Sequence, residues 1–195
     1  MKLIVNQFYH IYNQGNNQET TFHEREDYLR FLTKYKVLVA PYCDTINYCL
    51  MPNHFHFLIG ATEKSVEKTR LGGIEIDRVT DGFRKLLSEY AREFNEKYHR
   101  SGSLFRQKTK GKLLNDNRGE YATICFHYIH QNPYRAKLVK KMEDWEFSSF
   151  RDYTNFRNGI LCKKDIAYLY FELNVLNFYE DSYQVIPDSV IENLF

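Results

Sequence analysis

The chain lacks several patterns that would assign it to a large class of proteins. Its four cysteines show no CxxC spacing, which argues against a zinc cluster or a disulfide framework and predicts reduced thiols. No apolar run is long enough to span a membrane, and the first residues show no signal-peptide pattern. A GxxxxGKS/T phosphate-binding loop is also absent. We therefore expect a cytoplasmic protein without a disulfide scaffold or a nucleotide-binding loop of this type.

Basic side chains are missing from the end of the chain. Residues 165–195 contain six acidic residues and no Lys or Arg, so all 27 basic residues lie before them. A basic body suits a polyanionic partner, although an ordinary solvated surface can have the same composition. The length of 195 residues favours one domain with an extension. We expect the domain at 1–155 and an acidic, partly helical C-terminal extension at 156–195.

Hydrophobic periodicity predicts an α+β fold. Alternating side chains predict strands at 8–12, 45–51 and 54–59, and a fourth strand that ends near residue 114. Apolar residues at helical spacing predict helices from Glu24 to before Pro41, through residues 83–94, and from Gly119 to Gln131. This order argues for an antiparallel sheet covered by helices.

The remaining segments give weaker signals. Residues 61–80 are polar, contain two adjacent glycines and suggest a mobile loop or excursion. Residues 115–117 offer N-caps for the third helix, and Pro133 is expected to end it. In the extension, helical patterns occur at 164–178 and 189–194.

Two histidines one residue apart stand out within the third strand. Side chains alternate along a strand, so His54 and His56 share a face, while Phe55 and Phe57 point the other way into a core. The two imidazoles are then about 6.6 Å apart along the strand. Both can reach one divalent metal ion at that spacing. The alternative is a strand with two hydrogen-bonded histidines and no metal.

The third helix carries a second candidate pair. Tyr128 and Asn132 are four residues apart, so in a continuous helix they share a face. A tyrosine hydroxyl can attack a phosphodiester when a metal positions the phosphate, and an amide oxygen can complete the metal's ligands. Alternatively, Tyr128 is a core aromatic residue and Asn132 simply lies at the helix end. Pro133 disfavours helical geometry just before it.

Basic and aromatic residues alternate between the second helix and the fourth strand. This interleaving suits phosphate contacts combined with a ring that stacks on a base. A solvated charged loop is the alternative. The candidate DNA-binding residues are Arg100, Phe105, Arg106, Lys108, Lys110 and Lys112.

The two motifs together resemble those of the HUH single-tyrosine transposases, and the REP-associated tyrosine transposases in particular. The first motif is Met51-Pro52-Asn53-His54-Phe55-His56, and the second is Tyr128-Ile129-His130-Gln131-Asn132-Pro133-Tyr134-Arg135-Ala136. The resemblance covers about residues 5–155 and leaves the extension unexplained. We expect a structural role for His130, which belongs to the second motif.

This resemblance implies a ferredoxin-like HUH endonuclease fold and an enzyme that cleaves single-stranded DNA beside a hairpin. Tyr128 would be the nucleophile of a 5′-phosphotyrosine intermediate, and strand transfer would rejoin the ends. His54, His56 and Asn132 would bind Mg²⁺ or Mn²⁺, although related transposases often have Gln at the third position.

The family also implies a partner and a setting. The DNA would carry a REP-like hairpin or a terminal inverted repeat, and the protein would be a monomer or a homodimer that associates with the bacterial nucleoid. Two alternatives stay open: a hairpin-binding protein without turnover, and a metal-dependent nuclease that uses water.

Overall fold

A central sheet of four strands organises the computed structural model, which describes residues 1–114 and 120–192. The expected N-caps at 115–117 lie outside the described residues. The strands are β1 (Phe8–Gln14), β2 (Cys43–Met51), β3 (His54–Ala61) and β6 (Lys110–Leu113). They lie in the order β2-β3-β1-β6, and each neighbouring pair is antiparallel.

Helices α1 (Arg25–Leu38) and α3 (Arg78–Lys97) connect these strands. The resulting order, strand–helix–strand–strand–helix–strand, is the ferredoxin-like arrangement. Pro52 and Asn53 form the two-residue turn between β2 and β3. The predicted α+β fold with an antiparallel sheet is confirmed.

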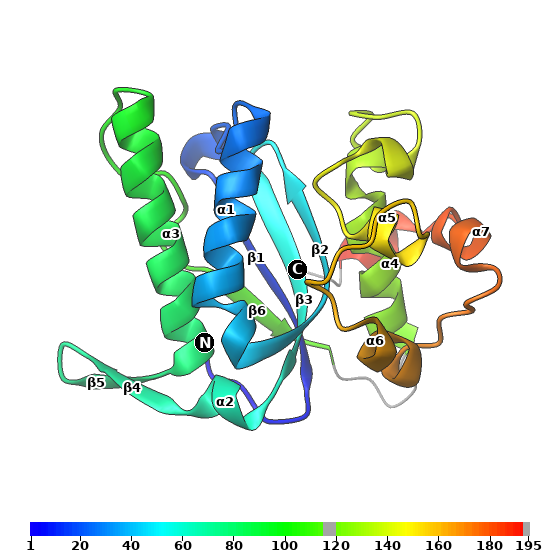
Figure 1. The fold of residues 1–195 in the computed structure, drawn as a ribbon, viewed down its shortest axis with the longest axis horizontal. Helices are drawn as coiled ribbons and strands as arrows, with labels where there is room; N and C mark the ends of the chain where they lie inside the picture. Colours follow the sequence, from blue (N-terminus) through cyan, green and yellow to red (C-terminus); the bar gives the residue numbers. More distant parts are fainter. Residues whose placement is uncertain (115–119, 193–195) are drawn as a thin grey trace.

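The sheet lies between two helical layers (Figure 1). Helices α1 and α3 cover one face, and α4 (Glu120–Arg135) covers the other. Tyr35 of α1 stacks on Phe57 of β3, with ring centroids 4.0 Å apart. Phe55, Phe57 and Ile59 are fully buried on this side, as the alternation along the strand predicts. The histidines of β3 therefore face α4.

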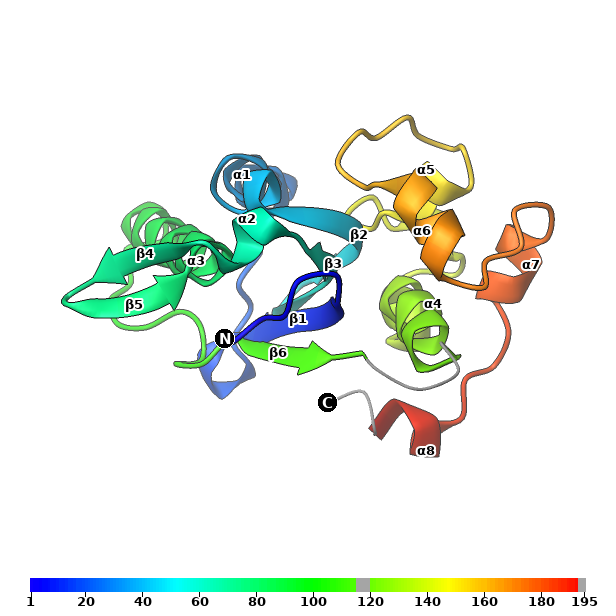
Figure 2. The same cartoon turned by 90° about the horizontal axis from the view of Figure 1, so that it is seen from below.

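The polar residues after β3 form regular structure. Helix α2 (Glu63–Val66) is followed by a hairpin of β4 (Lys68–Leu71) and β5 (Ile74–Asp77). Gly72 and Gly73 make its turn with positive φ angles of 54° and 84°, which glycine adopts at little cost. The expected excursion is thus an ordered hairpin arm that projects beyond α3 (Figures 1 and 2).

Helix α4 continues through Pro133 to Arg135, so the prediction that Pro133 ends this helix is wrong. Proline has no N–H for the carbonyl four residues earlier, which here belongs to Ile129. The Asn132 side chain compensates, because its Nδ2 lies 2.9 Å from the Tyr128 carbonyl and 3.5 Å from the Ile129 carbonyl. The helix keeps its last turn, and the side chain of Asn132 is held in place.

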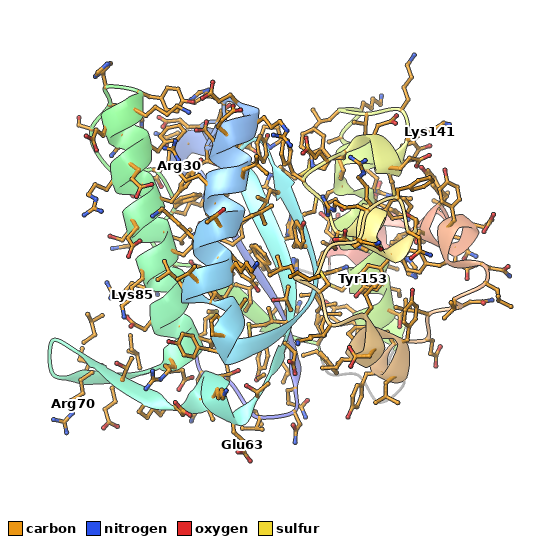
Figure 3. All side chains as sticks on the ribbon, in the orientation of Figure 1. Arg30, Glu63, Arg70, Lys85, Lys141 and Tyr153 are labelled. Carbon is orange, nitrogen blue, oxygen red and sulfur yellow. The ribbon has the colours of Figure 1, made fainter. Side chains whose placement is uncertain are left out.

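The described residues after α4 pack on this helix and along the edge strand β2. They form α5 (Phe150–Tyr153), α6 (Lys164–Tyr170), α7 (Phe178–Ser182) and α8 (Asp188–Ile191). Short 3₁₀ turns occur at Asn16–Gln18, Ala40–Tyr42 and Met142–Asp144. Tyr153, the last residue of α5 (labelled in Figure 3), packs against α4, with its ring centroid 5.0 Å from that of Phe126. The helical pattern expected at 164–178 breaks after Tyr170, and the last helix starts one residue before the predicted position.

The structure also bears on the cysteines and on membrane-spanning helices. All four cysteines are free thiols and buried. Within residues 1–114 and 120–192, no helix is both long and apolar enough to cross a membrane.

Candidate active site

The register of the sheet places the histidine pair on the face that α4 covers. His54 lies opposite Gln14 of β1, and His56 lies between Tyr12 of β1 and Cys49 of β2. Directly opposed residues in antiparallel strands share a face. The side chain of His56 is only 2% exposed, whereas that of His54 is partly exposed at the start of the strand.

Helix α4 brings the second predicted pair to this face. The ring of Tyr128 meets that of His56 edge to face, with centroids 6.0 Å apart. The Asn132 side chain lies close enough to the ring of His54 and to the phenol of Tyr128 to affect the pKa of each. The structure therefore brings together His54, His56, Tyr128 and Asn132 from β3 and α4 of one chain.

Neighbouring side chains hold one nitrogen of each imidazole. His10 Nε2 lies 2.8 Å from His56 Nδ1, and Asn53 Oδ1 lies 2.6 Å from His54 Nδ1. A histidine that binds a metal usually has its other ring nitrogen held by such a hydrogen bond, which fixes the tautomer and the ring orientation. His10 is itself fully buried.

Burial controls the protonation of all three titratable groups. Burial lowers the pKa of His54 to about 4, against a smaller opposing effect of the nearby Asn132 side chain. Burial also holds the pKa of His56 well below its usual range, with His54 and His10 adding to the effect. Both imidazoles are therefore neutral at pH 7. Burial raises the pKa of Tyr128 to about 12, so its phenol keeps its proton.

The donor set fits a divalent cation that keeps part of its coordination for substrate. Neutral imidazole binds metals, and an amide oxygen suits Mg²⁺ or Mn²⁺. In the described part of the chain, no group of three or more His, Cys, Asp or Glu residues is arranged to hold a metal. A bound ion would therefore depend on oxygen ligands from a phosphate or water in addition to His54, His56 and Asn132.

Three of the predicted DNA-binding cations share the face of the histidines. The Arg106 N–H donates to the Gln14 carbonyl at 2.8 Å, one residue beyond the bridge between Gly15 and Phe105. Gln14 also pairs with His54 on its other side. The side chain of Arg106 is therefore expected on the same face of the sheet as that of His54. Strand β6 adds two more cations, through the pairs Lys110 with Tyr12 and Lys112 with His10.

The structure places the other three candidates elsewhere. Phe105 alternates with Arg106, so its side chain enters the opposite core and is only 5% exposed. Its ring lies 6.0 Å from that of Phe55, which leaves no open face for a base. Stacking on Phe105 is therefore not supported. Arg100 pairs with Glu19 at 2.7 Å, and Lys108 is exposed between the bridge and β6.

Sequence reasoning did not identify the role of His10. His10 and Tyr12 are two residues apart in the first strand, so their side chains share one face. The sequence did not show which strand lies opposite them or in which register. His130 is fully buried, and its Nε2 lies 2.8 Å from the Ser149 hydroxyl, which also hydrogen-bonds the backbone of Tyr48 in β2. This contact ties α4 to the sheet and agrees with the expected structural role.

Comparison with known proteins gives a sequence relative and a similar solved structure. No family model matches the chain. A Haemophilus influenzae protein named as a REP-associated tyrosine transposase is 28% identical over 140 residues, which are 68% of this chain and 74% of the relative. A solved structure of a REP-associated tyrosine transposase bound to a REP hairpin matches with a TM-score of 0.57 and 13% identity, over 80% of this chain and 83% of that one. Both findings agree with the resemblance drawn from the two motifs.

Proposed function

We propose, because this chain resembles the REP-associated tyrosine transposases in sequence and in fold, that it binds a DNA hairpin and cleaves the adjoining single strand. The observation that carries the proposal is the meeting of two motifs. Tyr128 and Asn132 of α4 lie against His54 and His56 of β3, although the motifs are more than 70 residues apart in sequence. A role in the core alone explains Tyr128, but it leaves the histidine pair unexplained.

The proposed reaction is a transesterification. The phenolic oxygen of Tyr128 attacks the phosphorus, the bond from phosphorus to the 3′ oxygen breaks, and a free 3′ hydroxyl leaves. The 5′ phosphate stays on Tyr128, and attack by another 3′ hydroxyl reverses the step, so no nucleotide cofactor is needed.

His54, His56 and Asn132 would hold Mg²⁺ or Mn²⁺, and such an ion would supply positive charge to neutralise and orient the scissile phosphate. The chain's own part is to aim the phenol and to exclude water around it. Tyr128 must lose its proton during the attack, and its raised pKa of about 12 opposes that loss before DNA binds. The burial of His56 and Tyr128 strengthens electrostatic interactions inside the site.

We assign the phosphate contacts beside the site to Arg106, Lys110 and Lys112. Side chains alternate between the two faces along this segment, and these three lie on the face of the histidines. They are at the edge of the sheet that β6 forms. Lys108 is exposed in the same segment and can add a contact. Each phosphate that such a cation neutralises releases counterions and makes binding depend on salt.

Tyr128→Phe tests the covalent mechanism. With Mn²⁺ and a single strand flanked by a hairpin, we expect the parent protein to form a protein–DNA adduct on denaturing gels, and Tyr128→Phe to form none. Tyr134→Phe is the matched control, because Tyr134 lies on the same helix but is exposed and packs against Tyr183. Cleavage by Tyr128→Phe at the parent rate would disprove the mechanism.

A hairpin-binding protein without turnover is the second candidate, favoured by the deep burial and raised pKa of Tyr128. Hairpin binding that survives His54→Ala and His56→Ala, with no adduct for the parent protein in Mg²⁺ or Mn²⁺, would select it. Cleavage by the parent without any adduct would instead indicate a nuclease that uses water.

A further inference from the structure

Helix α4 carries a second polar stripe beside the one that holds Tyr128. His127, Gln131 and Arg135 are spaced four residues apart, so they line one side of the helix. Successive residues are about 100° apart around a helix, so this stripe is adjacent to that of Tyr128 and Asn132. The Tyr128 stripe faces the histidines of β3, and the His127 stripe faces residues 182–188 of the extension.

Gln131 makes the central contact between α4 and this segment. Its Nε2 donates to the Ser182 carbonyl at 2.9 Å and to the Gln184 carbonyl at 2.8 Å. The side chain is only 3% exposed, so both bonds lie largely out of water. A buried amide that serves two carbonyls at and just beyond the end of α7 is hard to replace, since its loss leaves those acceptors unsatisfied.

The two outer residues of the stripe extend the contact along the helix. His127 Nδ1 lies 3.1 Å from the Ser182 hydroxyl. Arg135 donates to the Ile186 carbonyl at 3.2 Å and forms an ion pair with Asp188 at 2.5 Å. The stripe thus follows residues 182–188 over their whole length.

The segment is itself fixed to the body of the protein. Phe178, just before it, is buried with its ring centroid 5.4 Å from that of Tyr153. The Tyr183 hydroxyl donates to a Glu143 carboxylate oxygen at 2.8 Å and accepts from the Met142 N–H at 2.8 Å. Residues 182–188 therefore give α4 a fixed support on the side next to the site.

We propose that residues 182–188 clamp the outer stripe of α4 and so set the rotation of the helix that aims Tyr128 at the histidines. Gln131 is the positioning residue of this clamp. Any rotation of α4 that moves Tyr128 away from His56 also breaks the two hydrogen bonds of Gln131, because both stripes belong to one rigid helix. The proposal rests on the proposed function for its catalytic consequence, but the clamp itself is a property of the folded chain.

Gln131→Met and Arg135→Gln test the clamp in the full-length protein. Gln131→Met keeps the length of the side chain and removes both donors, and Gln7→Met makes the same chemical change at a partly buried residue before β1. Hydrogen exchange is measured across α4 and across β1–β3. We expect exchange in α4 to rise about tenfold in Gln131→Met, and less in Arg135→Gln, with the sheet unchanged.

Adduct formation supplies the catalytic readout. We expect Gln131→Met to lower the rate of adduct formation by about tenfold at saturating hairpin DNA, with hairpin affinity within about twofold of the parent. Gln7→Met should leave both unchanged. A cavity effect on overall stability would instead lower protection throughout the sheet.

Two further outcomes would overturn the clamp. Unchanged exchange in α4 would show that residues 182–188 do not hold the helix. A gain in hairpin affinity with normal cleavage would show that the segment covers the DNA site. If the parent protein forms no adduct, the proposed function fails and the exchange measurement alone decides the clamp.

Discussion

The contact between His10 and His56 determines which nitrogen of the second histidine is available to the site. His10 Nε2 holds His56 Nδ1 at 2.8 Å, so Nε2 of His56 is the nitrogen directed to the side where Tyr128 lies. If His56 binds a metal through Nε2, its Nδ1 carries the proton and donates to His10. The role of His10 is then to fix the tautomer and orientation of a ligand.

Removing His10 should weaken metal binding before DNA is present. We expect His10→Ala to lower the affinity for Mn²⁺ by about 10- to 100-fold, the usual effect of losing such a partner. Titration calorimetry on the protein without DNA measures this directly. His99→Asn is the control, since His99 is exposed after α3. An unchanged affinity in a folded His10→Ala protein would show that His56 needs no such support or is not a ligand.

At the scale of secondary structure, Asp27 joins the start of α1 to the end of α3. Its buried carboxylate accepts the backbone N–H groups of His23 and Glu24 and the hydroxyl of Tyr98, and it pairs with Lys97 at 2.7 Å. Burial alone would raise the pKa of Asp27, but these hydrogen bonds outweigh it and hold the pKa below its usual range. The charged form therefore stabilises the fold.

Asp27→Asn should destabilise the protein in a way that depends on pH. At pH 7 we expect the free energy of unfolding to fall by about 1–3 kcal/mol, because a charged acceptor of several hydrogen bonds is lost. The parent binds fewer protons at Asp27 when folded than when unfolded, so its advantage is present above the ordinary Asp pKa. It declines as the pH falls through the depressed value. Urea unfolding at several pH values checks this, and Glu26→Gln is the control because Glu26 is exposed. The prediction is contradicted if the difference in free energy of unfolding between the parent and Asp27→Asn does not depend on pH.

The sequence predicts well those elements in which apolar and polar residues follow the period of the helix or strand. Phe55 and Phe57 alternate with His54 and His56, so strand β3 and its two faces follow from residue types alone. Local rules failed where another side chain compensated, as Asn132 does for Pro133 within α4. Phe105 shows a second limit of prediction from sequence. Its burial depends on a backbone bridge to Gly15, which the spacing of residues in the sequence does not indicate.

For the candidate site, sequence and structure contribute different parts. The residue types of His54, His56, Tyr128 and Asn132 suggested metal and phosphate chemistry, and the structure places all four together. The partners that hold them could not be foreseen, since His10 meets His56 through strand register. The clamp contacts of α4 likewise depend on tertiary packing of a segment with no recognisable motif.

At the scale of the whole molecule, one chain supplies both halves of the site. Tyr128 lies beside the histidines of its own chain, and residues 182–188 of the same chain hold the helix that carries it. An exchange of α4 between two copies would require these clamp contacts and the link between His130 and Ser149 to break in both. We therefore expect Tyr128 to act in cis, whether the protein is a monomer or a dimer.

Mixing two inactive variants tests this expectation. One variant carries His54→Ala and His56→Ala, and the other, made larger by a tag, carries Tyr128→Phe. If the tyrosine acts in cis, every copy lacks half of its site, so the mixture should form no adduct with hairpin-flanked DNA even after unfolding and joint refolding. A tyrosine that acts in trans would pair the intact histidines of one copy with the intact Tyr128 of the other. DNA would then become attached to the smaller variant, and its mobility on a denaturing gel would identify it and disprove the cis arrangement.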